Sequence, residues 1–429
     1  MNSHLKLVAL GCALGIAGCT QGSLSGAVPA TSAMGAAPGR IAASRLGVRP
    51  LNGSGDPLLY DFQGDPDGST PYGALADVGG VLYGTTYQGG TNNLGSIFSV
   101  TTGGSELVVH SFSGGDGEYP LAGLINVNGT LYGAAPEGTG SAGYGDVFSY
   151  DPASNTFQVI YRFQDAPTDG QVPVCDLTYV NGALYGTTEE GGNAGGWGTV
   201  FKLIISGSKS GQESIVYNFQ GTIDGGPDGA RPEAGVLYHD GLLYGTTYAG
   251  GAKGEGTLFS ISLATGKETI LHTFGSKKKD GDAPQADLLF YKNKLYGTAS
   301  TGGIVGGDCG GLGCGTVFQS TLAGTYKTLY PFDPNASRAD GLRPLAGLID
   351  VDGTFYGTTA DSAPEGYGTV FSVTPAGTEH VLVTVGFGPP PWPKSPAGAL
   401  IDVGGVLYGT SLQTTTPSGG DGTVYALPI

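Results

Sequence analysis

Six aspartates recur along this chain in one short context, Asp-Gly-x-x-Pro, and they carry the most regular chemistry in the sequence. They are Asp67, Asp116, Asp169, Asp228, Asp280 and Asp340. Carboxylate oxygens are the ligands that Ca²⁺ prefers, so a set of such residues on one face is a candidate calcium site. The alternative is a turn, in which the aspartate bonds the backbone, the glycine takes positive φ and the proline opens a strand. We favour the turn and expect no resident metal or other cofactor, because a residue repeated throughout a structure usually builds that structure.

Aromatic side chains provide a second candidate site. Tyr144, Trp197 and Tyr367 each stand directly before a Gly-Thr-Val-Phe phrase or its variant, and Trp392 lies in a proline-rich loop. On one shared face, these four rings would offer a surface for stacking on a sugar ring or a peptide. Large aromatic rings also bury much area, so the alternative is that they fill gaps between packed sheets.

The chain has five cysteines, and two of them, Cys309 and Cys314, lie in its longest loop. We predict a disulfide that closes this loop, since an exported protein meets an oxidising compartment. Two thiols without a nearby histidine are too few for a zinc site. Cys175 falls in a predicted strand and is expected to be a buried free thiol.

Catalysis has little support in the sequence, and no catalytic residue is assigned. There is no nucleophile elbow and no His-Glu-x-x-His motif. The glycines from Gly138 to Gly143 match the dinucleotide-binding pattern, but no helix is predicted after them, so the match is attributed to chance. The net charge of −17 makes nucleic acid and anionic lipid surfaces poor partners.

The elements that must position these residues come as seven repeats of two phrases. The first is Leu82-Tyr83-Gly84-Thr85. Its tyrosine recurs in seven copies, from Tyr83 to Tyr408, so one repeat is about 54 residues long. The second is Gly198-Thr199-Val200-Phe201. A period near ~50 residues with several short strands per unit is typical of a β-propeller.

Each repeat is predicted to form four strands. The first begins near a proline and turns through a hairpin such as Asn181-Gly182 into the Leu-Tyr-Gly strand. The Gly-Thr-Val-Phe strand follows, and the fourth ends on an aromatic pair such as Tyr161 and Phe163. The glycine of Leu-Tyr-Gly is expected to permit close approach between blades. Loops between strands two and three, and between strand four and the next first strand, should open on one rim, where variable loops usually bind ligands.

The two ends of the repeat region are complementary. Residues 57–62 provide a lone fourth strand, and residues 396–429 provide strands one to three. We predict that the two segments form one blade, which closes an all-β, seven-bladed propeller of four-stranded blades over residues 57–429. Closure leaves only short, protected sheet edges.

The recurring phrases resemble a known bacterial family. Leu-Tyr-Gly-Thr-Thr…Gly-Gly, Gly-Thr-Val-Phe and Phe…Asp-Gly…Pro are similar to the "choice-of-anchor" tandem repeat called GloVer over residues 57–429. The strand order also resembles kelch repeats, although the regular kelch tryptophan is missing. The GloVer resemblance implies export with an anchor and implies no defined reaction.

The N-terminus has the features of an export signal. The apolar stretch from Leu7 to Ile16 is too short to span a bilayer and fits a signal peptide. The sequence Ile16-Ala17-Gly18-Cys19 resembles the bacterial lipobox, which implies cleavage before Cys19 and lipidation of that residue. We therefore expect a signal peptide at 1–18, and a lipidated cysteine with a disordered tether at 19–56. The expected location is the outer membrane of the cell envelope. The sequence does not decide between its periplasmic side and the cell surface.

Together these features predict an exported, lipid-anchored, monomeric propeller that binds a glycan or another envelope protein through its variable loop face. One alternative is a lyase or hydrolase with its site in the central funnel. The other is a structural envelope protein without a small ligand. Because propellers host many unrelated functions, the fold alone does not decide among these.

Overall fold

The computed structural model describes residues 57–138, 143–193, 195–221, 228–333, 340–362, 366–385, 392–415 and 420–429. All of them belong to one compact unit. Apart from two short 3₁₀ helices, η2 (Gly207–Lys209) and η3 (Gly307–Cys309), the regular elements in these ranges are β-strands. None of the helices found there is long and apolar enough to cross a membrane.

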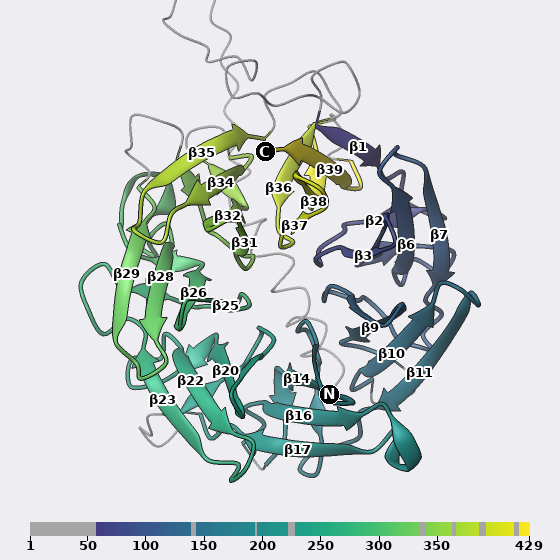
Figure 1. The fold of residues 1–429 in the computed structure, drawn as a ribbon, viewed down its shortest axis with the longest axis horizontal. Helices are drawn as coiled ribbons and strands as arrows, with labels where there is room; N and C mark the ends of the chain where they lie inside the picture. Colours follow the sequence, from purple (N-terminus) through teal and green to yellow (C-terminus); the bar gives the residue numbers. More distant parts are fainter. Residues whose placement is uncertain are drawn as a thin grey trace, which may run out of the picture. The chain divides into compact units, whose positions relative to one another are not determined.

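The protein is a seven-bladed β-propeller, and Figure 1 shows the seven sheets around a common centre, with strands such as β7, β11 and β17 outermost. Blade 1 comprises β3 (Ala76–Val78), β4 (Val81–Thr86), β6 (Ser96–Thr101) and β7 (Glu106–Ser111). Blade 2 comprises β8 (Ile125–Val127), β9 (Thr130–Ala135), β10 (Asp146–Asp151) and β11 (Thr156–Arg162). Blade 3 comprises β13 (Thr178–Val180), β14 (Ala183–Thr188), β16 (Thr199–Ile204) and β17 (Glu213–Asn218).

The later blades repeat this antiparallel order. Blade 4 comprises β19 (Leu237–His239), β20 (Leu242–Thr247), β22 (Thr257–Ser262) and β23 (Glu268–Thr273). Blade 5 comprises β25 (Leu289–Tyr291), β26 (Lys294–Ala299), β28 (Thr316–Thr321) and β29 (Tyr326–Pro331). Blade 6 comprises β31 (Ile349–Val351), β32 (Thr354–Thr359), β34 (Thr369–Val373) and β35 (Glu379–Thr384). In blades 1 to 6 the first strand begins five residues after its proline.

Blade 7 joins the two ends of the propeller region. It comprises β36 (Pro393–Pro396), β37 (Ile401–Asp402), β38 (Val406–Thr414), β39 (Thr423–Pro428) and β1 (Leu58–Asp61). β1 pairs antiparallel with β39, with Leu58 opposite Tyr425 and Asp61 opposite Thr423. The early segment thus takes the fourth-strand place in the last sheet.

Short two-residue ladders link loops outside the main sheets. They are β2 (Gly68–Ser69) with β5 (Gln88–Gly89), β12 (Gly170–Gln171) with β15 (Glu190–Gly191), β18 (Gly229–Ala230) with β21 (Ala249–Gly250), β24 (Gly281–Asp282) with β27 (Thr301–Gly302), and β30 (Gly341–Leu342) with β33 (Asp361–Ser362). Each ladder pairs the loop that enters a blade with the loop between its second and third strands. The two kinds of loop therefore share one rim, which we call the loop face.

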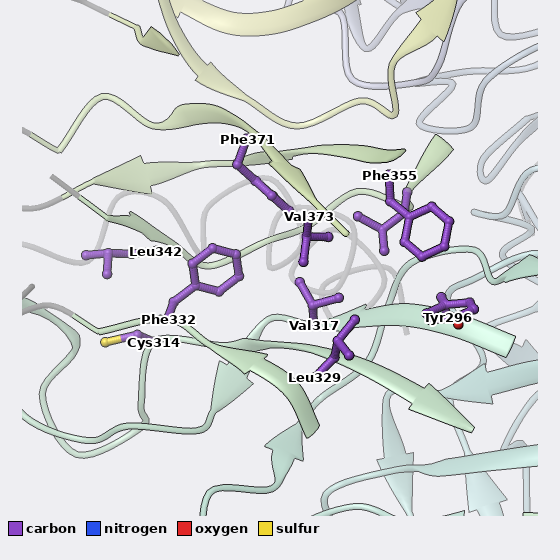
Figure 2. Packing of buried hydrophobic residues seen from close by; sticks show 10 residues of the cluster. Tyr296, Cys314, Val317, Leu329, Phe332, Leu342, Phe355, Phe371 and Val373 are labelled. Carbon is purple, nitrogen blue, oxygen red and sulfur yellow. The ribbon is translucent and has the colours of Figure 1, made fainter. Parts of the chain in front are cut away.

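The hydrophobic core lies between neighbouring blades. Figure 2 shows one cluster, in which Val317 and Phe332 of blade 5 pack with Phe355 and Phe371 of blade 6. The glycine of Leu-Tyr-Gly has a different role from the expected one. A Cβ on Gly84 would lie 2.5 Å from the ring of Phe98, its cross-strand neighbour in the same blade. It makes room within a blade rather than between blades.

Candidate functional site

The six aspartates of Asp-Gly-x-x-Pro, here called the turn aspartates, accept hydrogen bonds on the loop face. Asp169 shows the pattern, because its Oδ1 accepts from the backbone N–H of Gly170, while its Oδ2 accepts from the Tyr161 hydroxyl and the Gln164 N–H, at 2.7 to 2.8 Å. Asp67, Asp228 and Asp340 have the same three kinds of partner. These are the contacts of a turn that links one blade to the next. In the described part of the chain, no group of three or more His, Cys, Asp or Glu residues gathers as a metal site would require.

The partner of each turn aspartate also contacts the following blade. Four of these partners are tyrosines, Tyr60, Tyr161, Tyr217 and Tyr330, and each lies against a glutamate of the next blade, Glu106, Glu213, Glu268 and Glu379. Burial, together with the neighbouring turn aspartate, raises the pKa of Glu106, Glu213 and Glu268 to about 7.

Two junctions replace the tyrosine by histidine, and the glutamate changes with it. His110 stacks on Phe157 with ring centroids 3.7 Å apart, and His272 stacks on Tyr326 at 3.6 Å. A phenol hydroxyl can contact a carboxyl, whereas an imidazole face packs on a ring. Where histidine replaces the tyrosine, an aromatic ring of the next blade replaces the glutamate, so these positions hold neighbouring blades together.

Trp392 stands four residues before Pro396, which is the place of a turn aspartate in blade 7. Its indole Nε1 is buried and has no hydrogen-bond partner among the described residues, and its carbonyl accepts from the N–H of Thr415. Blade 7 thus opens with β36 paired to β38 instead of with an aspartate turn.

Tyr144, Trp197 and Tyr367 occupy one repeated position, and all three are half-buried. Their carbonyls accept from the N–H groups of Val172, Arg231 and Ser395 in the next blade. The Trp197 ring lies over Gly221, where a Cβ would come within 2.6 Å. Tyr367 carries the Lys394 ammonium 5.3 Å from its ring centroid. Three of the four predicted aromatics therefore lie at equivalent places on the loop face, while Trp392 lies at a different one.

The residues immediately before the first-strand prolines, here called the ring residues, share an unusual backbone conformation. They are Thr70, Tyr119, Val172, Arg231, Ala283, Arg343 and Ser395, with φ between 54° and 60°. Each N–H donates to a carbonyl of the preceding blade at 2.6 to 3.0 Å. None is glycine, although this region of φ favours glycine and the chain contains 81 of them.

One charged group on the loop face is built around a ring residue, Arg231. Its Nε and Nη2 lie 2.8 and 2.6 Å from Glu189 Oε1, and Nη2 lies 3.2 Å from Glu233 Oε1. Burial raises the pKa of Glu189, and the Arg231 charge opposes that rise. The guanidinium also lies over the Tyr248 ring at 5.0 Å. A second pair joins Arg343 to Asp361 at 3.1 Å.

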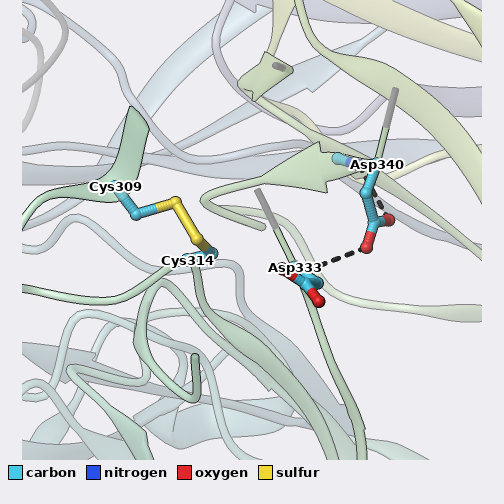
Figure 3. The surroundings of a disulfide bond; sticks show 5 residues. Cys309, Cys314, Asp333 and Asp340 are labelled. Carbon is cyan, nitrogen blue, oxygen red and sulfur yellow. Dashed lines mark hydrogen bonds between the residues drawn. A yellow bond between two sulfur atoms is a disulfide. The ribbon is translucent and has the colours of Figure 1, made fainter. Parts of the chain in front are cut away.

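Cys309 and Cys314 are joined by a disulfide in the loop between β26 and β28 (Figure 3). Cys314 is buried, and its carbonyl accepts from the N–H of Arg343, so the disulfide fixes a loop at a blade junction. Figure 3 also shows the Asp333 N–H directed at the carboxylate of Asp340. Cys175 is a buried free cysteine.

Sequence reasoning missed Asp176 and Asp287, which stand three residues after a first-strand proline. Asp176 Oδ1 accepts from the N–H of Gly123 and Asp287 Oδ1 from that of Gly235, both at 2.6 Å. Burial and the Asp176 charge raise the pKa of Asp287 to about 7. Three other blades carry glycine here, so aligning the repeats would have revealed both residues.

Comparison with known proteins identifies the repeat. The model of the Gloeobacter/Verrucomicrobia repeat matches residues 50–195 and 140–336, which together cover more than half of the chain. The chain belongs to the Gloeobacter/Verrucomicrobia repeat family. This confirms the GloVer resemblance of the repeated phrases. Comparison with curated proteins gives no match.

Several solved structures are similar to this member of the Gloeobacter/Verrucomicrobia repeat family. One is titled an oligogalacturonate lyase in complex with manganese, with 10% identity, a TM-score of 0.45, and coverage of 84% of this chain and 89% of that one. A nidogen/laminin complex gives 13% identity, a TM-score of 0.37, and coverage of 59% and 77%. TolB from Acinetobacter baumannii gives 12% identity, a TM-score of 0.35, and coverage of 59% and 52%.

Proposed function

We propose that the protein is exported, is anchored to the outer membrane through a lipid on Cys19, and binds a glycan through its loop face. Cys19 and the segment 1–56 lie outside the described residues, so the anchor and location rest on the signal-like sequence alone. The binding role rests on the ring residues and their neighbours.

The observation that carries the binding role is the contrast between constant backbone and varied side chains at the ring residues. All seven share one φ and one inter-blade hydrogen bond. Glycine would satisfy that backbone at the lowest conformational cost, and a β-branched residue such as Val172 is especially unfavourable there. Strain of this kind is kept where side chains are needed. Val172, Ala283 and Ser395 are buried, whereas the side chains of the other four, Thr70, Tyr119, Arg231 and Arg343, are partly exposed. Four different side chains at equivalent places suit recognition of an asymmetric ligand.

A glycan fits the chemistry of these side chains better than an apolar ligand does. Tyr87 and Tyr119 place rings 5.2 Å apart, and Arg231 with its two glutamates supplies both donors and acceptors. Binding sites of this kind combine aromatic surface with a few placed polar groups. Loops carried by a rigid scaffold are where such sites are most often found.

An enzymatic role is the second candidate, and one observation favours it. At one blade junction two buried glutamates, Glu189 and Glu233, pair with the partly exposed Arg231, and such titratable clusters are frequent at active sites. A hydrolase or lyase would use two carboxyls in separate acid and base roles.

The test is a glycan array combined with activity screens on the soluble fragment 57–429. We expect the parent fragment to bind one class of glycan without converting it to product. Arg231→Ala, which removes a charged hydrogen-bond donor, should bind that glycan at least about tenfold more weakly. Val174→Ala, which shortens an uncharged side chain in the connection between β12 and β13, serves as the control. Conversion of a substrate would support the enzymatic role instead. Neither binding nor activity would leave a structural role.

A further inference from the structure

Blade 2 differs from its neighbours at the start of its third strand. In five blades, hydroxyl side chains at the end of the second strand and the start of the third are hydrogen-bonded at 2.7 to 3.0 Å, in the pairs Thr86–Ser96, Thr188–Thr199, Thr247–Thr257, Thr359–Thr369 and Ser411–Thr423. In blade 2 the same register places Ala135 opposite Asp146. Alanine has no side-chain donor, so the second strand gives Asp146 no partner.

The Asp146 carboxylate is buried, with 1% of its surface exposed, and its Oδ2 has no hydrogen-bond partner among the described residues. A buried acceptor without a partner costs roughly 1–3 kcal/mol. Oδ2 lies beside Gly138, where a Cβ would come within 2.5 Å of it. The absent side chain of Gly138 is what leaves space in front of this oxygen.

That space is a cavity of about 140 Å³, lined by Gly138, Gly143, Tyr144, Gly145, Asp146, Arg162, Phe163 and Gln164. A cavity of about 150 Å³ in a protein core holds one benzene molecule, so this one has room for a single six-membered ring. Tyr144 is one of the aromatic residues that the sequence singled out. The cavity therefore brings a predicted ligand residue together with a carboxylate that the sequence did not single out.

The walls of the cavity select a neutral ligand that carries hydroxyl groups. Asp146 is an acceptor, and Arg162 supplies a guanidinium whose Nη2 also donates to the Gly115 carbonyl at 3.0 Å. Burial raises the pKa of Asp146, and the positive charge of Arg162 opposes part of that rise, so the two charged groups interact. A lone Ca²⁺ would need six or more oxygen ligands, and a single carboxylate lines this cavity.

We propose that this blade 2 cavity binds one pyranose ring of a neutral sugar, with a sugar hydroxyl donating to Asp146 Oδ2. The inference rests on the proposed glycan-binding function and names its primary subsite. Arg162 and Tyr144 line the same cavity and would contact the rest of the sugar ring.

The decisive variant is Ala135→Thr/Asp146→Thr, because it installs the hydroxyl pair that five other blades already have. It removes the acceptor from the cavity while restoring a side-chain arrangement that this fold accommodates. The matched control is Ala299→Thr, which installs the same pair opposite Thr316 in blade 5, away from the cavity. Thermal unfolding of each variant establishes that it is folded.

Binding is measured on the full-length chain in a non-glycosidic detergent. Saturation-transfer NMR is run with glucose, galactose, mannose and N-acetylglucosamine, and the best array glycan is titrated by calorimetry. We expect saturation transfer from at least one sugar to the parent and to Ala299→Thr, and at least about tenfold weaker binding by the double variant, because a charged acceptor is lost.

Two results would overturn the inference, and they are distinguishable. If the parent binds an array glycan and the folded double variant binds it equally well, the cavity is not the subsite, while the proposed function stands. If neither the parent nor the control binds any sugar or array glycan, both the inference and the glycan-binding function fail together.

Discussion

Blades 2 and 3 share one strand register, yet they use the start of the third strand differently. In blade 3 the Thr188 hydroxyl donates to the Glu190 carbonyl and lies 2.8 Å from the Thr199 hydroxyl, from which it accepts. In blade 2 the same places hold Ala135 and Asp146, and a cavity lies next to the carboxylate. The backbone ladders are the same in kind, so the strands do not depend on these side chains. Repeated backbone contacts hold a blade and leave single side-chain positions available for other uses.

Both blades belong to a closed ring of seven sheets, and opening that ring should have the largest effect on stability. Deleting residues 57–62 removes β1 from β39 and takes Leu59 and Phe62 out of the core cluster shared with Phe98. We expect cooperative thermal unfolding to be lost, as followed by circular dichroism. A truncation that removes only residues 1–56 is the control and should melt cooperatively. Equal melting of the two truncations would contradict closure through β1.

The turn aspartates of blades 2 and 3 should also differ in importance. The Asp169 side chain is buried and accepts three hydrogen bonds, whereas the Asp116 side chain is 24% exposed. Asp169→Ala leaves buried hydrogen-bond donors without an acceptor and should lower the free energy of unfolding by about 3 kcal/mol. Asp116→Ala should lower it by about 1 kcal/mol. Urea denaturation measures both. Similar losses in the two variants would show that burial of the turn does not set its contribution.

The two kinds of blade junction should respond differently to pH. The pKa of Glu106, Glu213 and Glu268 in the folded protein is about 7, above the ordinary value of 4.5. The folded state therefore holds more protons than the unfolded state between these values, so the stability from these groups is complete below about pH 4.5 and is lost as pH rises through 7.

We accordingly expect the melting temperature to fall between pH 5 and pH 8. Glu213→Gln removes one titrating group and should flatten this dependence. A melting temperature that rises over this range, in the parent protein, would show that these carboxyls are not the dominant titrating groups.

Restoring the blade 3 pattern in blade 2 should give a small gain in stability. Ala135→Thr/Asp146→Thr removes a buried acceptor without a partner and adds a hydroxyl pair. We expect about 1 kcal/mol of additional stability by urea denaturation. A clear loss of stability would mean that the Asp146 carboxylate has a structural partner in the folded protein.

The smallest expected effect is that of calcium. The oxygens of Asp169 already accept three hydrogen bonds, and the same holds for Asp67, Asp228 and Asp340, so we expect no change in melting temperature with millimolar Ca²⁺ or EDTA. A rise with Ca²⁺ that EDTA reverses would restore the calcium interpretation of these residues.

Much of the architecture could be predicted from the repeated phrases, because each phrase marks one strand and recurs in fixed order. The junction contacts were harder to predict. Tyr161 contacts Asp169, eight residues away, and Glu213, in the next blade. The first contact follows from a turn, but the second depends on how two sheets face each other. The exchange of Tyr and Glu for His and an aromatic ring is visible only when neighbouring repeats are compared.

The sequence by itself determined the number of blades, the strands within them and the shared rim of their loops, because each repeated phrase and each turn motif spans only a few residues and marks its strand locally. It also placed Tyr144, Trp197 and Tyr367 at one repeated position. Only the tertiary structure decided that Trp392 replaces a turn aspartate, that Arg231 gathers two buried glutamates, and that Asp146 borders a cavity with Arg162. These outcomes depend on which side chains from separate strands come within a few ångströms, and that distance is set by packing between sheets.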